Sequence, residues 1–160
     1  MRVEAPIAPK EQLTPTDFQV LGLLANNYTK EDVARRLNVQ KRYIVFIKRR
    51  IIDVFQESEM EEGLCKAISW SVLNYRVSVR YRHNPSRISL LDEKQLAIFV
   101  LMGRGWTRYQ IAEELGLASE KVVIHREKIT EKLGLRTIYA ATAMAADGIR
   151  QAQVNSGQQG

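Results

Sequence analysis

The side chains with the clearest chemistry lie in one short stretch, residues 41–50, which reads KRYIVFIKRR. Five basic residues are interleaved there with five apolar or aromatic ones, and the stretch contains no acid. Basic side chains neutralise phosphates, and an arginine can form two hydrogen bonds with guanine. The stretch could therefore bind a polyanion, lie on a membrane surface or belong to a core helix. The elements around it must decide between these uses.

Other kinds of chemistry find little support in the sequence. The chain has two histidines and one cysteine, Cys65, so it can form neither an internal disulfide nor a cysteine-based metal cage. We find no glycine-rich phosphate loop and no paired nucleophile and base. We therefore expect no enzymatic activity, no cofactor and no metal site.

The charge of the chain points to a polyanionic partner. Its 160 residues carry a formal net charge of +6, and the sequence pI is about 9.6. Nucleic acid and anionic lipid are both compatible with that sign. The start of the chain lacks the apolar run of a signal peptide, and no apolar stretch approaches the roughly 18 residues that span a membrane. We expect a cytoplasmic protein with no membrane partner.

The sequence contains an internal repeat. A shift of 78 positions aligns residues 13–55 with residues 91–133. The two segments share seven identities in 43 positions, and their apolar pattern agrees more closely than their letters do. Such a repeat predicts one small domain present twice.

Each copy is patterned as a series of helices. In the first copy Thr14 is a typical N-cap, with a proline next and Asp17 three residues later. A short second helix follows Thr29 in the first copy and Thr107 in the second. The predicted stops of these short helices are Asn38 and Gly116.

A longer third helix follows after a turn of about three residues. Its two versions read KRYIVFIKRRIIDVF and EKVVIHREKITEKL, and short helix, tight turn and longer helix make a helix-turn-helix arrangement. Fourth helices are expected over residues 60–75 and 137–148. The second of these is rich in alanine, so it could pack closely within its own domain or against a second molecule.

We therefore predict an all-α fold with two tandem four-helix helix-turn-helix domains. They span residues 13–77 and 89–150, and a short basic linker at 78–88 joins them. Residues 1–12 and 151–160 lack periodicity or are low in complexity, and we expect both ends to be flexible. The linker arginines could follow phosphates or simply face solvent; they are Arg76, Arg80, Arg82 and Arg87.

A helical wheel of residues 41–55 separates an apolar stripe from a basic face. With Ile44 at the centre of the buried stripe, Arg42, Phe46 and Arg49 project from the opposite side. A membrane-surface helix would expose its apolar residues together, which disfavours that use. A major groove admits an α-helix, and an aromatic edge can contact a thymine methyl group. We therefore interpret this helix as a recognition helix for duplex DNA, with Lys41, Arg42, Tyr43, Phe46, Lys48, Arg49 and Arg50 as candidate DNA-binding residues.

These motifs resemble the LuxR/NarL (GerE-type) DNA-binding domain. The segments LTPTDFQVLGLL and DVARRLNV match the front of that domain in the first copy, with Asp17 in place of the usual glutamate. In the second copy QIAEELGL, IHREKITEKLGL and RTIYAATAMA match the back. The first copy departs from the pattern at Ile47, where the family has histidine, and the second at Val123, where a lysine is usual. The resemblance covers roughly residues 13–77 and 89–150.

The resemblance implies a sequence-specific transcriptional regulator that binds double-stranded DNA. In the second copy it places a histidine and an arginine in the recognition helix, where two lysines add positive charge. The candidate DNA-binding residues of this helix are Lys121, His125, Arg126 and Lys128. His125 could equally pack inside the domain. A homodimer is a further option for this chain.

Charge reversals separate the two copies. The arginines at 35, 36, 42 and 49 align with glutamates at 113, 114, 120 and 127. Fifteen basic and ten acidic residues lie in 1–88, against nine and eight in 89–160, so the net charges are +5 and +1. The second copy could bind DNA or serve for protein contacts. The alternative function is thus a protein-interaction adaptor, similar to region four of sigma factors, that acts on RNA polymerase or another regulator.

Overall fold

The computed structural model describes residues 8–81 and 84–159 of the chain. Within these residues the secondary structure is helical and contains no strand, which confirms the all-α prediction. The first half contains α1 (Pro15–Ala25), α2 (Lys30–Arg36), α3 (Lys41–Val54) and α4 (Met60–Leu73). A 3-10 helix, η1 (Pro85–Leu90), precedes α5 (Glu93–Gly103), α6 (Arg108–Leu115), α7 (Ser119–Lys132) and α8 (Ile138–Gln159). The order short helix, turn, longer helix thus occurs in both halves.

Local capping explains where these helices begin. The hydroxyl of Thr14 accepts a hydrogen bond from the Asp17 backbone N–H, and the Asp17 carboxylate accepts one from the Thr14 N–H. Thr29 and Thr107 open α2 and α6 with the same reciprocal bonds. These N-caps confirm the predicted starts. The predicted stops also hold, because Asn38 and Gly116 both have a positive φ, 54° and 66°.

Two hydrophobic cores lie one in each half. Ile44 and Ile51 of α3 are fully buried in the first, and Val122 and Ile129 of α7 are fully buried in the second. The burial of Ile44 confirms the apolar stripe that the wheel predicted for the first of the third helices. Truncation of a buried isoleucine to alanine costs roughly 2–5 kcal/mol, so each stripe contributes a large share of the stability of its half.

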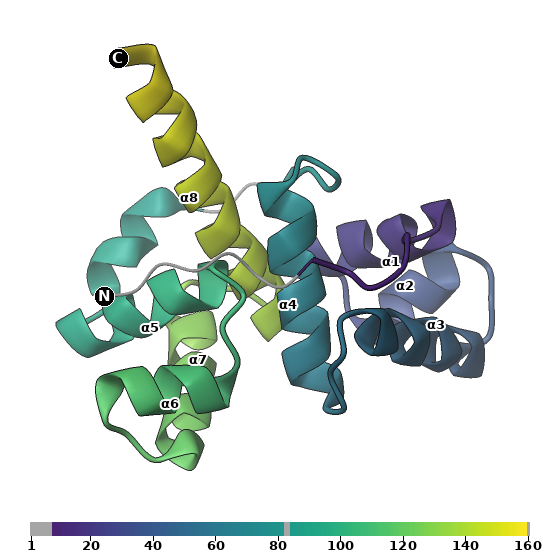
Figure 1. Ribbon diagram of the computed structural model, residues 1–160, viewed down its shortest axis with the longest axis horizontal. Helices are drawn as coiled ribbons and strands as arrows, with labels where there is room; N and C mark the ends of the chain where they lie inside the picture. Colours follow the sequence, from purple (N-terminus) through teal and green to yellow (C-terminus); the bar gives the residue numbers. More distant parts are fainter. Residues whose placement is uncertain (1–7, 82–83, 160) are drawn as a thin grey trace.

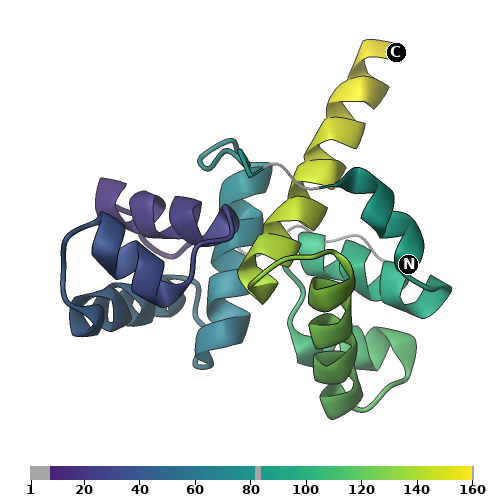
Figure 2. The same ribbon diagram turned by 180° about the vertical axis from the view of Figure 1, so that it is seen from behind.

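The two fourth helices join the halves. Figures 1 and 2 show α4 and α8 side by side in the middle of the molecule, with α1 to α3 on one side and α5 to α7 on the other. Ala143 and Ala146 of α8 belong to the first core, whereas Ala141 and Ala145 belong to the second. The alanine-rich helix therefore packs in its own half and also against the other half of the same chain.

Small residues allow α8 to lie close to α5. A Cβ added at Gly103 would lie 2.7 Å from the backbone carbon of Ala145, so the site requires a residue without a side chain. The Ser69 hydroxyl of α4 donates a hydrogen bond of 2.7 Å to the Gly103 carbonyl. The end of α5 is thus held against α4 by a buried hydrogen bond and against α8 by close packing.

The last helix and the linker differ from the predicted bounds. The helix expected over 137–148 continues to Gln159, because residues 149–159 contain no proline and several good helix formers. Figure 1 shows this end of α8 projecting from the body, and residues 151–157 are exposed. The predicted linker is partly helical, since η1 begins at Pro85 after an Asn84 cap. Arg82 and residues 1–7 and 160 lie outside the described residues, and the flexibility of both ends stays a prediction.

Candidate nucleic-acid interface

An exposed basic and aromatic face runs along α3. Arg42 and Arg49 are exposed, as the wheel predicted. Between them lie Phe46, which is 61% exposed, and Tyr43, which is 47% exposed. Their rings stack with centroids 6.4 Å apart and planes at 14°. Two large aromatic side chains left in solvent between two arginines form a surface suited to a base edge and its neighbouring phosphates. We call Arg42, Tyr43, Phe46 and Arg49 the α3 face.

Two other basic residues of α3 are tied to neighbouring helices. Lys41 is exposed and lies 3.9 Å from the Glu31 carboxylate, a weak contact that water and salt screen. Arg50 is half-buried, forms an ion pair with the buried Asp17 and donates a 3.1 Å hydrogen bond to the Thr14 hydroxyl. Arg50 therefore joins α3 to the start of α1, and its guanidinium is engaged within the domain.

Lys48, a candidate DNA-binding residue, lies in the interior and is not part of the exposed α3 face. Its side chain is 6% exposed. Burial lowers the pKa of Lys48, the positive charge of nearby Lys30 lowers it further, and Glu31 opposes both effects. The sequence contained the signal, because Lys48 follows the buried Ile44 by four residues and so lies on the same side of the helix.

The exposed face of α7 is mixed in charge. Lys121 and Lys128 are exposed, and His125 is half-buried. Glu120 and Glu127 are also exposed, as the charge reversals indicated. The four predicted site residues of α7 therefore do not form one basic surface.

Arg126, predicted as a DNA-binding residue, is also buried. Its side chain is 2% exposed, and its guanidinium donates hydrogen bonds of 2.9 and 2.7 Å to the two carboxylate oxygens of Glu62 on α4. A weaker bond of 3.3 Å reaches Glu61. The reason is the same as for Lys48: Arg126 follows the buried Val122 by one helical turn. Arg126 therefore holds α7 against the other half of the chain and does not face solvent.

Further polar contacts join the halves around this ion pair. Glu62 also accepts a 2.7 Å hydrogen bond from the backbone N–H of Arg108, at the start of α6. Arg136, just before α8, forms a 3.2 Å ion pair with Asp32, and its backbone N–H donates to the side chain of Asn27 at 2.7 Å. These contacts fix α3 and α7 relative to each other. The sequence does not reveal these contacts, because their partners lie far apart along the chain.

The linker arginines are also placed by contacts. Arg76 is exposed and lies over the Phe18 ring at 6.0 Å. Arg80 is exposed, and its backbone N–H donates to Asn26. Arg87 donates a 3.2 Å hydrogen bond to the carbonyl of Lys132 at the end of α7. The described part of the linker therefore lies against both halves.

Comparison with known proteins agrees with this geometry in the second half. Residues 89–145 match the family described as bacterial regulatory proteins, luxR family. Residues 89–145 are a LuxR-type helix-turn-helix domain. The match covers α5, α6, α7 and the start of α8, so it includes the mixed face of α7 and the buried Arg126.

A more distant similarity extends over most of the chain. This chain is 24% identical over 154 residues to a protein of Hyphomicrobium methylovorum named probable transcriptional regulatory protein SgaR. That alignment covers 83% of this chain and 72% of the relative. No solved structure matches the chain. Among the described residues, no helix combines the length and the hydrophobicity needed to span a membrane.

Proposed function

We propose that this chain is a DNA-binding transcriptional regulator built from a tandem, divergent pair of helix-turn-helix domains, at residues 13–77 and 89–150. The observation that carries the proposal is the α3 face. It stands on the third helix of the first half, the place that α7 occupies in the LuxR-type domain of the second half. The similarity to a protein named as a transcriptional regulator supports the same function.

The chemistry of the α3 face fits a major groove. Arg42 and Arg49 have no carboxylate within ion-pair distance among the described residues, so their guanidinium groups are available to bases and phosphates. Tyr43 and Phe46 expose apolar surface that thymine methyl groups can cover. Counterion release from the phosphates supplies affinity, and the base contacts supply specificity.

The second domain contributes less to DNA affinity in this proposal. The exposed Glu120 and Glu127 repel phosphates, and the buried Arg126 offers no compensating charge. Lys121 and Lys128 remain available for phosphate contacts. Since contacts across the halves fix α3 and α7 relative to each other, we propose that the two helices contact one duplex with unequal strength.

The acids of α7 also favour the second candidate function, a protein-interaction adaptor. An acidic helix could bind a basic surface of RNA polymerase or of another regulator. The effect of the double variant Glu120→Gln, Glu127→Gln on DNA affinity distinguishes the two functions. If α7 lies on DNA, removal of two repelling charges strengthens DNA binding. If α7 faces a protein, DNA affinity is unchanged.

The test of DNA binding uses the full chain and a duplex selected from a random pool. We expect Arg42→Ala with Arg49→Ala to abolish sequence preference and to flatten the salt dependence by about one unit of slope for each lost phosphate contact. The matched control is Lys10→Ala with Lys94→Ala, two exposed lysines outside the third helices. Equal loss in both double variants would reduce the effect to net charge and would contradict the proposal.

A further inference from the structure

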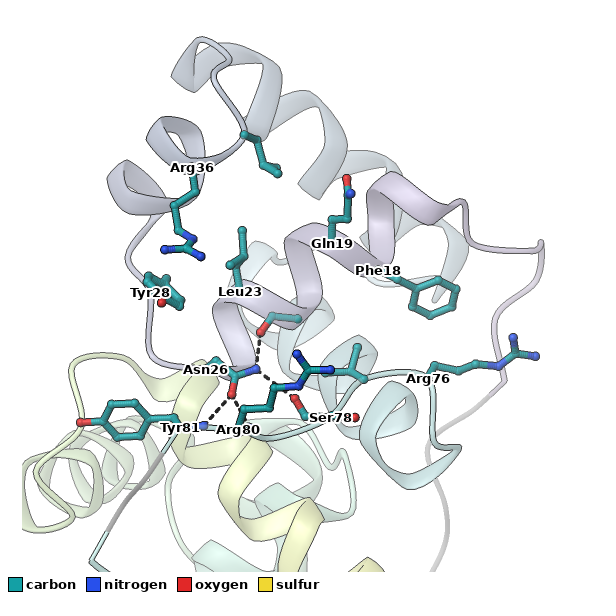
Figure 3. A pocket seen from close by; sticks show the side chains of 13 residues that line it. Phe18, Gln19, Leu23, Asn26, Tyr28, Arg36, Arg76, Ser78, Arg80 and Tyr81 are labelled. Carbon is teal, nitrogen blue, oxygen red and sulfur yellow. Dashed lines mark hydrogen bonds between the residues drawn. The ribbon is translucent and has the colours of Figure 1, made fainter.

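A groove lies on the α1 side of the first half, away from the α3 face. It has a volume of about 710 Å³ and runs between α1, the end of α2 and the segment 76–81 (Figure 3). None of its described lining residues comes from α3, and none is acidic. A partner in this groove would therefore leave the α3 face free.

One side chain builds the wall of the groove. The Asn26 side-chain oxygen accepts hydrogen bonds from the backbone N–H groups of Arg80 and Tyr81, at 2.5 and 2.8 Å. Its amide nitrogen donates to the carbonyls of Gly22 and Ser78, at 2.7 and 3.0 Å. Figure 3 shows these bonds holding the segment across the end of α1. The groove is thus already formed without a ligand.

Three arginines of the groove lack the partners that other arginines have. Arg36, Arg76 and Arg80 are exposed, and no carboxylate lies within ion-pair distance of them in the described part of the chain. Arg36 lies over the Tyr28 ring at 4.8 Å, and Arg76 over the Phe18 ring. By contrast, six arginines form ion pairs with carboxylates: Arg35, Arg50, Arg108, Arg126, Arg136 and Arg150.

The stacking contacts leave these guanidinium groups prepared for an anion. A guanidinium over an aromatic ring keeps the N–H groups at its edge, where they can donate two parallel hydrogen bonds to a carboxylate. Figure 3 shows Arg36 and Arg76 at opposite ends of the groove, with Arg80 between them. Donors spread along a groove suit an extended chain with several acids better than one small anion.

A glycine on the groove side of α1 supplies an independent observation. Gly22 lies inside the helix, where glycine is less stable than alanine. A Cβ added there would meet no atom within 4 Å, so no packing within the described chain requires a glycine. Its missing side chain leaves the floor of the groove open beside Leu23 and allows another backbone to approach closely.

We propose that the α1 groove binds an acidic, amphipathic segment of a partner protein. Carboxylates of that segment pair with Arg36, Arg76 and Arg80, its apolar side chains cover Leu23, and its backbone passes over Gly22. This interaction is distinct from DNA binding, and it would let a DNA-bound molecule hold a second protein. If the groove binds no such segment, the proposed DNA binding is unaffected.

The test measures binding of a dye-labelled synthetic peptide to the full chain by fluorescence anisotropy. The peptide alternates Glu and Leu, the spacing of an amphipathic extended chain, and its counterpart carries Lys in place of each Glu. We expect only the Glu peptide to bind. The triple variant Arg36→Ala, Arg76→Ala, Arg80→Ala should weaken its binding at least about tenfold. The control Lys10→Ala, Lys94→Ala, Lys128→Ala removes the same charge elsewhere and should leave binding within about twofold of the parent.

A second variant separates docking from folding. Gly22→Leu replaces a glycine by a good helix former that points into open space, so the melting temperature should not fall. The new side chain fills the floor of the groove, and Glu-peptide binding should weaken at least about tenfold.

Three results would overturn the proposal. One is failure of the Glu peptide to bind, and another is an equal loss of binding in the two triple variants. The third is displacement of the peptide by duplex DNA, together with loss of DNA affinity in the triple variant Arg36→Ala, Arg76→Ala, Arg80→Ala. That result would assign these arginines to phosphate contacts.

Discussion

The Arg126 guanidinium on α7 and the Glu62 carboxylate on α4 form a bidentate ion pair, with hydrogen bonds of 2.9 and 2.7 Å, across the two halves of the chain. Both side chains are buried, Glu62 to 3% exposure. A buried ion pair is costly to break because the remaining charge has no partner and no water. The pair therefore makes the second half of the chain dependent on the first.

We expect Glu62→Ala and Arg126→Ala each to lower the free energy of unfolding by about 3–5 kcal/mol, since each leaves one buried charge unpaired. The double variant Glu62→Leu with Arg126→Met leaves no charge behind and should be more stable than either single variant. Denaturant unfolding of the full chain measures all three. Single variants within about 1 kcal/mol of the parent would show that solvent reaches the pair.

The same pair predicts sensitivity to acid. Burial alone would raise the pKa of Glu62, but the hydrogen bonds and charge of Arg126 outweigh burial and hold that pKa below its usual value. A carboxyl whose pKa is lower in the folded state stabilises the fold above its unfolded pKa, about 4.3 for glutamate, and this stabilisation is lost as the pH falls through the folded pKa.

The melting temperatures of the parent and of Glu62→Gln should therefore differ at neutral pH and converge below about pH 4. Glu131→Gln, a change at an exposed carboxylate, serves as the control and should follow the parent throughout. A gap between the parent and Glu62→Gln that stays constant down to acid pH would contradict the assignment of this acid sensitivity to Glu62.

Cys65 provides a probe of global opening. Burial on α4 raises the pKa of its thiol to about 12, so the reactive thiolate is scarce in the folded protein. We expect a thiol reagent at mildly alkaline pH to label Cys65 only as the protein unfolds, and faster in Arg126→Ala than in the parent. Rapid labelling of the native parent would show that α4 and α8 separate without unfolding.

Phe46 should make the selected DNA site sensitive to thymine methyl groups. Replacement of one contacted thymine by uracil removes a single methyl group, which is worth about 0.8 kcal/mol or roughly a fourfold loss of affinity. Phe46→Ala should bind the two duplexes equally, whereas Leu96→Ala, at an exposed apolar residue of α5, should retain the discrimination. If the parent itself does not distinguish thymine from uracil at any position, Phe46 does not contact the base.

Local features of the fold could be predicted from the sequence, and features that depend on distant partners could not. The caps at Thr14, Thr29 and Thr107 involve residues three positions apart, so the sequence shows both partners. The Glu62–Arg126 pair and the insertion of α8 between two cores depend on how the halves meet. No local pattern records that arrangement.

The residues of the candidate site also divide into those predicted correctly from the sequence and those that were not. The exposure of Arg42, Phe46 and Arg49 follows from helical periodicity, and the structure confirms it. Lys48 was assigned to DNA by residue type and Arg126 by the family resemblance, although helical periodicity places both one turn after buried residues. Their burial shows that position on the helix outweighs residue type when a basic side chain finds room or a partner inside.

The packing of α8 also determines how the two halves of the chain can be compared. Ala143 and Ala146 lie in the first core, so a fragment of residues 89–160 would expose the surface that α4 covers. Differences between isolated halves would then reflect folding as well as DNA contacts. Substitutions in the full chain keep both cores intact.

Selection of bound duplexes from a random pool, with the full chain and with the Arg42→Ala, Arg49→Ala variant, tests the proposed function most directly. We predict two unlike half-sites about 10 base pairs apart, or a multiple of that spacing, because one helical turn separates equivalent groove positions. The variant should lose the half-site that contributes most of the affinity and retain at most the weaker one. Failure of the parent to enrich any sequence, or an identical motif for the parent and the variant, would contradict the account.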